Sequence, residues 1–199
     1  PAVEHLQKAD PAWVSEWLAV QVGEGVLYHA DHWLKFAPGV PDALVEKFLS
    51  RLESENLEHA RFEGMIRVIA GGATAKLAAR VFAKTRELSV KAPATRDKLE
   101  WAILHQLEVV FRSLPDDAAV TGVLASINGA GEPIDIVVAA HLLGKVGRRN
   151  DASLQLSDPD LKARLREYLK GNLGTILTQD DFDGGDKANL ASAIAQLGH

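Results

Sequence analysis

The chain has 199 residues, of which 47% are apolar, and this suffices for a folded, soluble protein whose core needs no crosslinks. Cysteine is absent, which excludes disulfides, thiol nucleophiles and cysteine-ligated zinc or iron–sulfur centres and is compatible with a reducing cytoplasm. The formal net charge of −5 disfavours nucleic acid as a partner, because attraction to phosphates needs clustered lysine and arginine.

Neither a membrane segment nor an export signal is predicted. No apolar run approaches the roughly 18 residues of a membrane helix. Residues 1–10 lack the apolar centre of a signal peptide, so we expect a cytoplasmic protein. The chain starts with proline rather than methionine, so a signal upstream of Pro1 stays an open alternative.

The first two predicted helices lie near the start of the chain. Asp10 and Pro11 mark a helix start, because an aspartate caps free N–H groups and a first-turn proline has none to lose. We expect this helix to reach Gly23 and a second one to span residues 26–34. Four aromatic residues near the start of the chain are predicted to pack in the core, with a partner-binding anchor as the alternative: Trp13, Trp17, Trp33 and Phe36.

The segment Leu44–Gly72 predicts a hairpin of two short antiparallel helices. The first apolar stripe has helical spacing and consists of Leu44, Val45, Phe48, Leu49 and Leu52. After a polar break at residues 54–56, the second stripe consists of Phe62, Met65, Ile66 and Ile69. Glycines at the end of the segment stop the second helix. Two such stripes cannot cover each other fully, so further helices must pack against the hairpin.

The rest of the chain also predicts helices. Apolar stripes between proline and glycine boundaries indicate helices over residues 77–88, 99–114, 120–127, 134–146, 161–176 and 190–197. The segment 99–114 is apolar nearly all round, so we expect it to be covered on two sides. A strand is the alternative for residues 134–146, although their length favours a buried helix. Ser157 and Asp160 predict a capping box for the helix that follows them.

Three segments share one pattern. Residues 64–71, 140–147 and 191–198 each begin with a small residue and end with glycine. Each is the second member of a predicted helix pair, and small residues let neighbouring helices approach closely. The recurrence therefore predicts equivalent places in a stack of helix pairs. The first two segments lie far enough apart to hold one more pair, formed by residues 77–88 and 99–114.

This pattern resembles the HEAT-like or armadillo-like α-solenoid family, whose repeats are helix pairs of roughly 40 residues. The resemblance implies an all-α fold of about ten helices in a right-handed superhelical stack, with residues 1–199 as a single repeat domain. It also implies a non-enzymatic scaffold, without a cofactor, that binds a protein or peptide through its second helices. The repeats lack a consistent first-helix proline and an Asp-Arg ladder, so a non-repetitive helical bundle is the alternative. The chain ends on a second helix, from which we expect further repeats in a longer protein.

One row of polar residues is the predicted partner-binding surface. Glu55, His59, Glu63 and Arg67 follow each other at four-residue spacing, which places them on one face of a helix. The first three could instead hold a divalent ion or orient a general base, and this gives the alternative of a helical metal-binding domain or enzyme.

A second candidate for metal binding is the pair His29 and His32. At a spacing of three residues the two imidazoles would share one face of the second helix. A metal would need a third donor, for which His5, His59 or Glu63 are candidates. The alternative is an exposed histidine pair without a ligand.

Two other motifs lack residues that their chemistry requires. The acidic segment 180–186 lacks the glycine and glutamate positions of an EF-hand loop, so helix capping explains it better. Residues 71–76 lack the Gly-Lys-Ser/Thr ending of a phosphate-binding loop. Neither a calcium site nor a nucleotide site is predicted.

Overall fold

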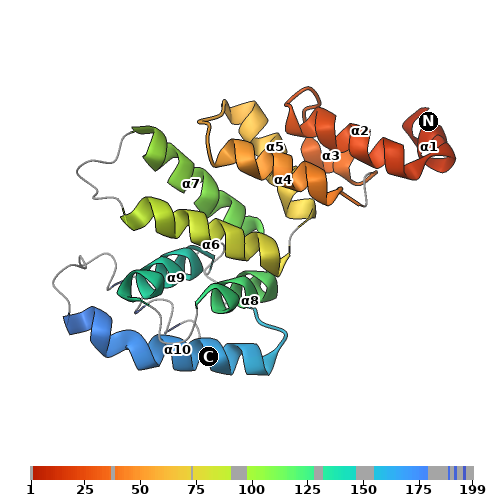
Figure 1. Ribbon diagram of the computed structural model, residues 1–199. Helices are drawn as coiled ribbons and strands as arrows, with labels where there is room; N and C mark the ends of the chain where they lie inside the picture. The colour runs from red at the N-terminus through yellow and green to blue at the C-terminus, as the bar shows by residue number, and fades with distance from the viewer. Residues whose placement is uncertain are drawn as a thin grey trace. The chain divides into compact units, whose positions relative to one another are not determined.

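The computed structural model describes residues 2–36, 39–72, 74–90, 98–127, 132–146 and 155–178, and the single positions 188, 191 and 195. All regular elements within these residues are helices (Figure 1), which confirms the predicted all-α class. The chain divides into two compact units, each made of two stretches of sequence. Residues 1–73 and 97–113 form the first unit, and residues 74–96 and 114–199 form the second.

The first unit contains six of the helices, which are α1 (Ala2–Ala9), α2 (Pro11–Gly23), α3 (Ala30–Leu34), α4 (Asp42–Leu52), α5 (His59–Gly71) and α7 (Lys98–Ser113). As predicted, Asp10 caps α2, and its carboxylate accepts a hydrogen bond from the backbone N–H of Trp13 at 3.0 Å. Helix α1 precedes the first helix that the sequence predicts. It has only eight residues, fewer than the window over which a helical period can be recognised, and Val3 is half-buried against the α2 core.

The second predicted helix is shorter than expected. Residues 26–28 are not helical, and α3 begins only at Ala30. Gly25 and His29 both have left-handed backbones, with φ of 71° and 60°, which helical residues do not adopt. The N–H groups of Val26 and Leu27 instead both donate to the carbonyl oxygen of Gln21, at 2.9 and 3.1 Å. The segment therefore folds back onto the end of α2 before α3 starts.

The predicted hairpin forms as α4 and α5, which pack against each other. All five residues of its first stripe are buried, and so are Met65, Ile66 and Ile69 of the second. Helix α5 also crosses α2 very closely, because a Cβ atom at Gly64 would lie 1.9 Å from the carbonyl oxygen of Val22. A glycine is therefore required at this crossing, and the hairpin needs its neighbour as expected.

Helix α7 packs against α4 and α5 with one broad face. The buried residues of this face are Ile103, Leu104, Leu107, Val110 and Phe111. Leu99 and Trp101 are exposed, so the expectation that this helix is covered on two sides is wrong. The same buried face carries Gln106, whose side-chain amide lies against the connection between α4 and α5. It can accept from the N–H of Leu57 at 3.1 Å while donating to the carbonyl oxygen of Glu55 at 3.0 Å.

The second unit contains α6 (Ala75–Val90), α8 (Asp116–Ser126), α9 (Pro133–Val146) and α10 (Pro159–Thr178). Helices α6 and α8 approach closely at Gly122, where a Cβ atom would lie 2.4 Å from the carbonyl oxygen of Ala75 and 2.5 Å from Cβ of Ala78. Residues 133–146 are helical, so the alternative of a strand is wrong. Helix α10 buries Leu161, Leu165 and Leu169 at four-residue spacing.

The start of α10 differs from the predicted capping box. Asp158 caps the helix, and its carboxylate accepts from the N–H of Asp160 at 2.9 Å. Ser157 turns away, because its hydroxyl donates to the Asp117 carboxylate at the start of α8, which also accepts its backbone N–H at 3.0 Å. A long-range contact therefore replaces the local one that the sequence predicts.

The predicted helix pairs are confirmed only in part. Helices α4 and α5 form one pair, but α6 and α7 belong to different compact units, so the extra pair expected from residues 77–88 and 99–114 forms within neither unit. Of the three segments that share the small-residue pattern, 64–71 lies at the close crossing with α2. Residue 147 and most of 191–198 lie outside the described residues.

Candidate partner-binding surfaces

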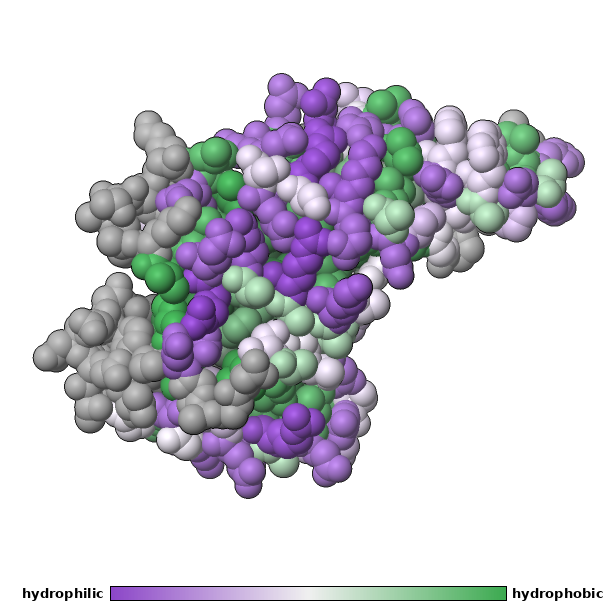
Figure 2. Space-filling view, in the orientation of Figure 1, coloured by the Kyte–Doolittle hydropathy of each residue, from purple (hydrophilic) through white to green (hydrophobic). Residues whose placement is uncertain are grey.

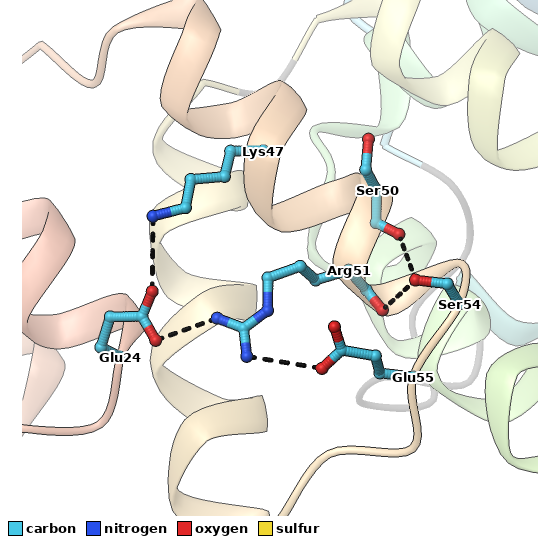
Figure 3. A network of polar contacts seen from close by, with 6 residues as sticks. All are labelled: Glu24, Lys47, Ser50, Arg51, Ser54 and Glu55. Carbon is cyan, nitrogen blue, oxygen red and sulfur yellow. Dashed lines mark hydrogen bonds and ion pairs between the residues drawn. The ribbon is translucent and has the colours of Figure 1, made fainter.

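A network of charged side chains connects the end of α2 to α4 (Figure 3). Nη1 of Arg51 donates to Oε2 of Glu24 at 2.9 Å, and Nζ of Lys47 lies 3.5 Å from the other oxygen of the same carboxylate. Nη2 of Arg51 reaches Glu55 at 3.4 Å. The hydroxyl of Ser54 donates to two carbonyl oxygens in the last turn of α4. Together these contacts fix the end of α4 and the residues after it.

The electrostatics of this network keep it ionised. Burial by itself raises the pKa of Glu24, but the hydrogen bond and positive charge of Arg51, aided by Lys47, outweigh it and hold this pKa below its usual value. The hydrogen bond to Glu24 in turn raises the pKa of Arg51. Neither group therefore exchanges a proton near neutral pH, so the pair holds structure rather than acting as an acid or base.

The predicted row of Glu55, His59, Glu63 and Arg67 forms only in part. Helix α5 begins at His59, so Glu55 lies outside it, and its carboxylate pairs with Arg51 instead. The expectation that all four residues share one helical face is therefore wrong for Glu55. The other three follow each other on α5 with exposed side chains, and Nε2 of His59 lies 3.5 Å from Oε1 of Glu63.

The predicted shared helical face of His29 and His32 is also wrong. The left-handed backbone of His29 precedes α3, whereas His32 lies inside the helix. Both side chains are exposed. The His32 ring packs edge-on against Trp33, with 5.1 Å between ring centroids, and against Phe36 at 6.3 Å. This ring therefore has an aromatic environment rather than a second imidazole beside it.

The described residues contain no group of three or more His, Cys, Asp or Glu side chains placed to hold a metal ion. The acidic segment 180–186 lies outside the described residues. Within the described part of the chain, no helix combines the length and apolar character needed to cross a membrane.

Trp13 and Trp17 form an exposed aromatic pair on α2. The side chains are 52% and 41% exposed, and their rings stack with centroids 6.2 Å apart and planes 14° from parallel. The prediction that both belong to the core is wrong. Trp33 and Phe36, by contrast, are half-buried and pack against the core residues Val14 and Leu18, as predicted.

The residue order along α2 explains this difference. Two apolar lines run side by side along the helix. Val14, Leu18 and Val22 continue over three turns and are buried. The line of Trp13 and Trp17 ends one turn later on Gln21, which is polar. The longer and fully apolar line is the feature of the sequence that indicates which face of α2 is buried. The shorter line remains on the surface.

A second polar cluster lies in the other unit, and the sequence patterns do not predict it. Arg86 on α6 pairs with the Asp135 carboxylate on α9 and lies 2.6 Å from Glu132. Asp135 is buried and also accepts the N–H of Glu132 at 3.0 Å. The Tyr168 hydroxyl on α10 is buried without a hydrogen-bond partner among the described residues, and burial, reinforced by the charge of Asp135, raises its pKa. The cluster is a structural ion pair inside the unit.

Comparisons with known proteins identify no relative: no family model matches the chain, no curated protein sequence is significantly similar, and no solved structure matches. A function for this chain must therefore be proposed from the surfaces of its two units.

Proposed function

We propose that this chain is a non-enzymatic scaffold of the HEAT-like α-solenoid type that binds a protein or peptide. The observation that carries the proposal is the exposed pair of Trp13 and Trp17 on α2. Tryptophan is strongly enriched at the energetic centres of protein interfaces. Covering the exposed parts of two indoles contributes on the order of 1–2 kcal/mol each.

The support beneath the pair suits a binding surface. On the opposite side of α2, Leu18, Ala19 and Val22 are fully buried, so the helix that carries the indoles is anchored in the core. A rigid anchor loses little conformational entropy on binding. Figure 2 shows that purple, pale and green residues are mixed over the visible surface of α1 and α2.

The solenoid form is supported by the consecutive pair α4 and α5 and by the close crossing of α5 with α2. In a stack of this type the second helices line the partner-binding face. On this proposal His59, Glu63 and Arg67 of α5 contribute polar contacts, and Glu55 contributes through the network around Arg51.

The test is affinity capture from cell lysate followed by quantitative mass spectrometry. The wild-type chain is compared with Trp13→Ala/Trp17→Ala, with His59→Ala/Glu63→Ala/Arg67→Ala, and with Trp101→Ala, which removes another exposed tryptophan. We expect a defined set of proteins that the first variant loses, that the second retains in reduced amount, and that the third captures fully. Equal capture by the wild type and the double tryptophan variant, both folded by circular dichroism, would contradict the proposal.

A further inference from the structure

The aromatic rings of the first unit differ in whether a cation covers them. Nζ of Lys35 lies 4.9 Å from the centre of the Phe36 ring, and Nζ of Lys47 lies 5.5 Å from that of Phe48. No described cation lies over Trp13 or Trp17. Indole is a better cation acceptor than phenyl, because its ring face is more negative. The lysines of this unit therefore leave open two exposed indoles, Trp13 and Trp17.

The one charged residue of α2 is acidic. Glu16 follows Trp13 by three residues and directly precedes Trp17, so its carboxylate projects from the same exposed side of α2. It forms no ion pair with any residue that the structure describes. Residues 9–34 contain no lysine or arginine, and their acidic residues are Asp10, Glu16, Glu24 and Asp31.

Asp10 and Glu24 already have hydrogen-bond or ion-pair partners within the protein. Asp10 caps α2, and Glu24 pairs with Arg51 and Lys47. Glu16 is thus the carboxylate on the exposed face of α2 that is free to neutralise a charge brought in by a partner.

We propose that Trp13, Glu16 and Trp17 form a binding site for an arginine side chain of the partner. This inference rests on the proposed function and adds the chemistry of the ligand. A guanidinium is planar, so it can stack on an indole and at the same time donate two hydrogen bonds to a carboxylate. It is also more weakly hydrated than an ammonium group, which lowers the cost of removing it from water.

The same arrangement selects against other ligands. A phosphate or carboxylate brought to this surface meets Glu16 and no described cation on α2, so acidic peptides and nucleic acid are disfavoured. A lysine can stack on the indole as a point charge but cannot match the carboxylate with a two-pronged contact. We therefore expect arginine to bind best, lysine more weakly, and the uncharged isostere citrulline very poorly.

The test begins with selection from a random peptide library displayed on phage, using the full chain as bait. Peptides that also bind the Trp13→Ala/Trp17→Ala variant are removed. Synthetic versions of the remaining peptides are then titrated by isothermal calorimetry, each with its arginine intact, replaced by lysine, or replaced by citrulline.

We expect the selected peptides to be enriched in arginine and the citrulline versions to bind at least about tenfold more weakly. Glu16→Gln should weaken the arginine peptides about tenfold, with little effect on the citrulline versions. Glu167→Gln is the matched control, because it removes the same charge from another exposed glutamate, on α10. It should leave affinity unchanged.

The outcomes separate this inference from the proposed function. Peptides that require both tryptophans but show no preference for arginine would overturn the arginine site and leave the scaffold proposal standing. Equal effects of Glu16→Gln and Glu167→Gln would also overturn it, since attraction would then follow net charge. A selection that yields no tryptophan-dependent peptide would count against both.

Discussion

The two compact units have one feature in common and differ in another. Each brings two helices together at a glycine, Gly64 between α5 and α2 in the first unit and Gly122 between α8 and α6 in the second. The first unit pairs Arg51 with a half-buried carboxylate, Glu24, whereas the second pairs Arg86 with a buried one, Asp135. The close crossings are therefore alike, but the charges are held in different environments.

This difference determines which contacts matter most in each unit. An ion pair that water still reaches, such as Arg51 with Glu24, exchanges water for a partner at little net gain, typically below about 1 kcal/mol. A buried carboxylate that loses its partner is left desolvated and costs several times more. We therefore expect the units to be similarly sensitive to changes at the glycines and unequally sensitive to loss of an arginine.

The largest expected effects come from the glycines. In Gly64→Ala the new Cβ would meet a backbone carbonyl oxygen at 1.9 Å, and in Gly122→Ala one at 2.4 Å, so whole helices must move apart. We expect each change to lower the free energy of unfolding by about 3 kcal/mol or more. Urea denaturation followed by circular dichroism measures this. A loss below about 1 kcal/mol at either site would show that the helices cross less closely than these distances require.

The next largest effect separates the two arginines. Arg86→Met keeps most of the side-chain volume but leaves Asp135 buried without its ion pair, and we expect a loss of about 2–3 kcal/mol. Arg51→Met, the matched change in the first unit, should cost less than about 1 kcal/mol. Equal losses in the two variants, measured by the same denaturation, would remove the distinction between the units. Adding Asp135→Asn to Arg86→Met removes the unpaired buried charge. Recovery of stability in this double variant would support the distinction between the units.

A smaller effect of opposite sign is expected on α10. Gly171 lies in the helix interior, and a Cβ atom there would meet nothing within 4 Å. Gly171→Ala should raise the free energy of unfolding by about 0.5–1 kcal/mol, because alanine loses less backbone entropy on folding. Thermal unfolding provides the measurement. No gain, or a loss, would indicate that another surface covers this position. Comparing Gly171→Ala with Gly122→Ala separates the helical preference of alanine from the steric clash of its Cβ atom.

The smallest expected effect is the pH dependence of the Glu24 pair. The pKa of Glu24 is lowered on folding, so its contribution is complete above the unfolded pKa of about 4.3 and is lost as pH falls through the lower folded value. The difference in unfolding free energy between wild type and Glu24→Gln should be below about 1 kcal/mol at about pH 7 and should shrink as pH falls below the unfolded pKa. A difference that grows on acidification would contradict the sign of this shift.

The sequence predicts the helices of this fold well where a stripe is long and its ends are marked. The predicted hairpin Leu44–Gly72 corresponds to α4 and α5, and Asp10 caps α2 as expected. Helix α1 and the shortened α3 were beyond this kind of reasoning. The first spans only eight residues, too few for a helical period to be recognised, and the second depends on a left-handed backbone at His29, which few residues other than glycine adopt.

The candidate surfaces could be predicted less well than the helices. His59, Glu63 and Arg67 are exposed at helical spacing, as their polar character indicates. Glu55 drops out of this row because the contact with Arg51 and the late start of α5 could not be derived from spacing. The sequence predicts Trp13 and Trp17 in the core, because large aromatic residues are usually buried. Which of two adjacent apolar lines on a helix faces inward depends on where its neighbours pack.

By itself, the sequence determined that this protein is helical, that it lacks thiol chemistry, and where most helices begin and end. These properties follow from local periodicity, capping and composition, which act over a few residues. Only the tertiary structure decided that α5 crosses α2 at Gly64, that α6 and α7 belong to different units, and that Trp13 and Trp17 remain exposed. Those outcomes depend on which distant surfaces meet, and the energy of such contacts is set by shape and burial rather than by the order of residues along one helix.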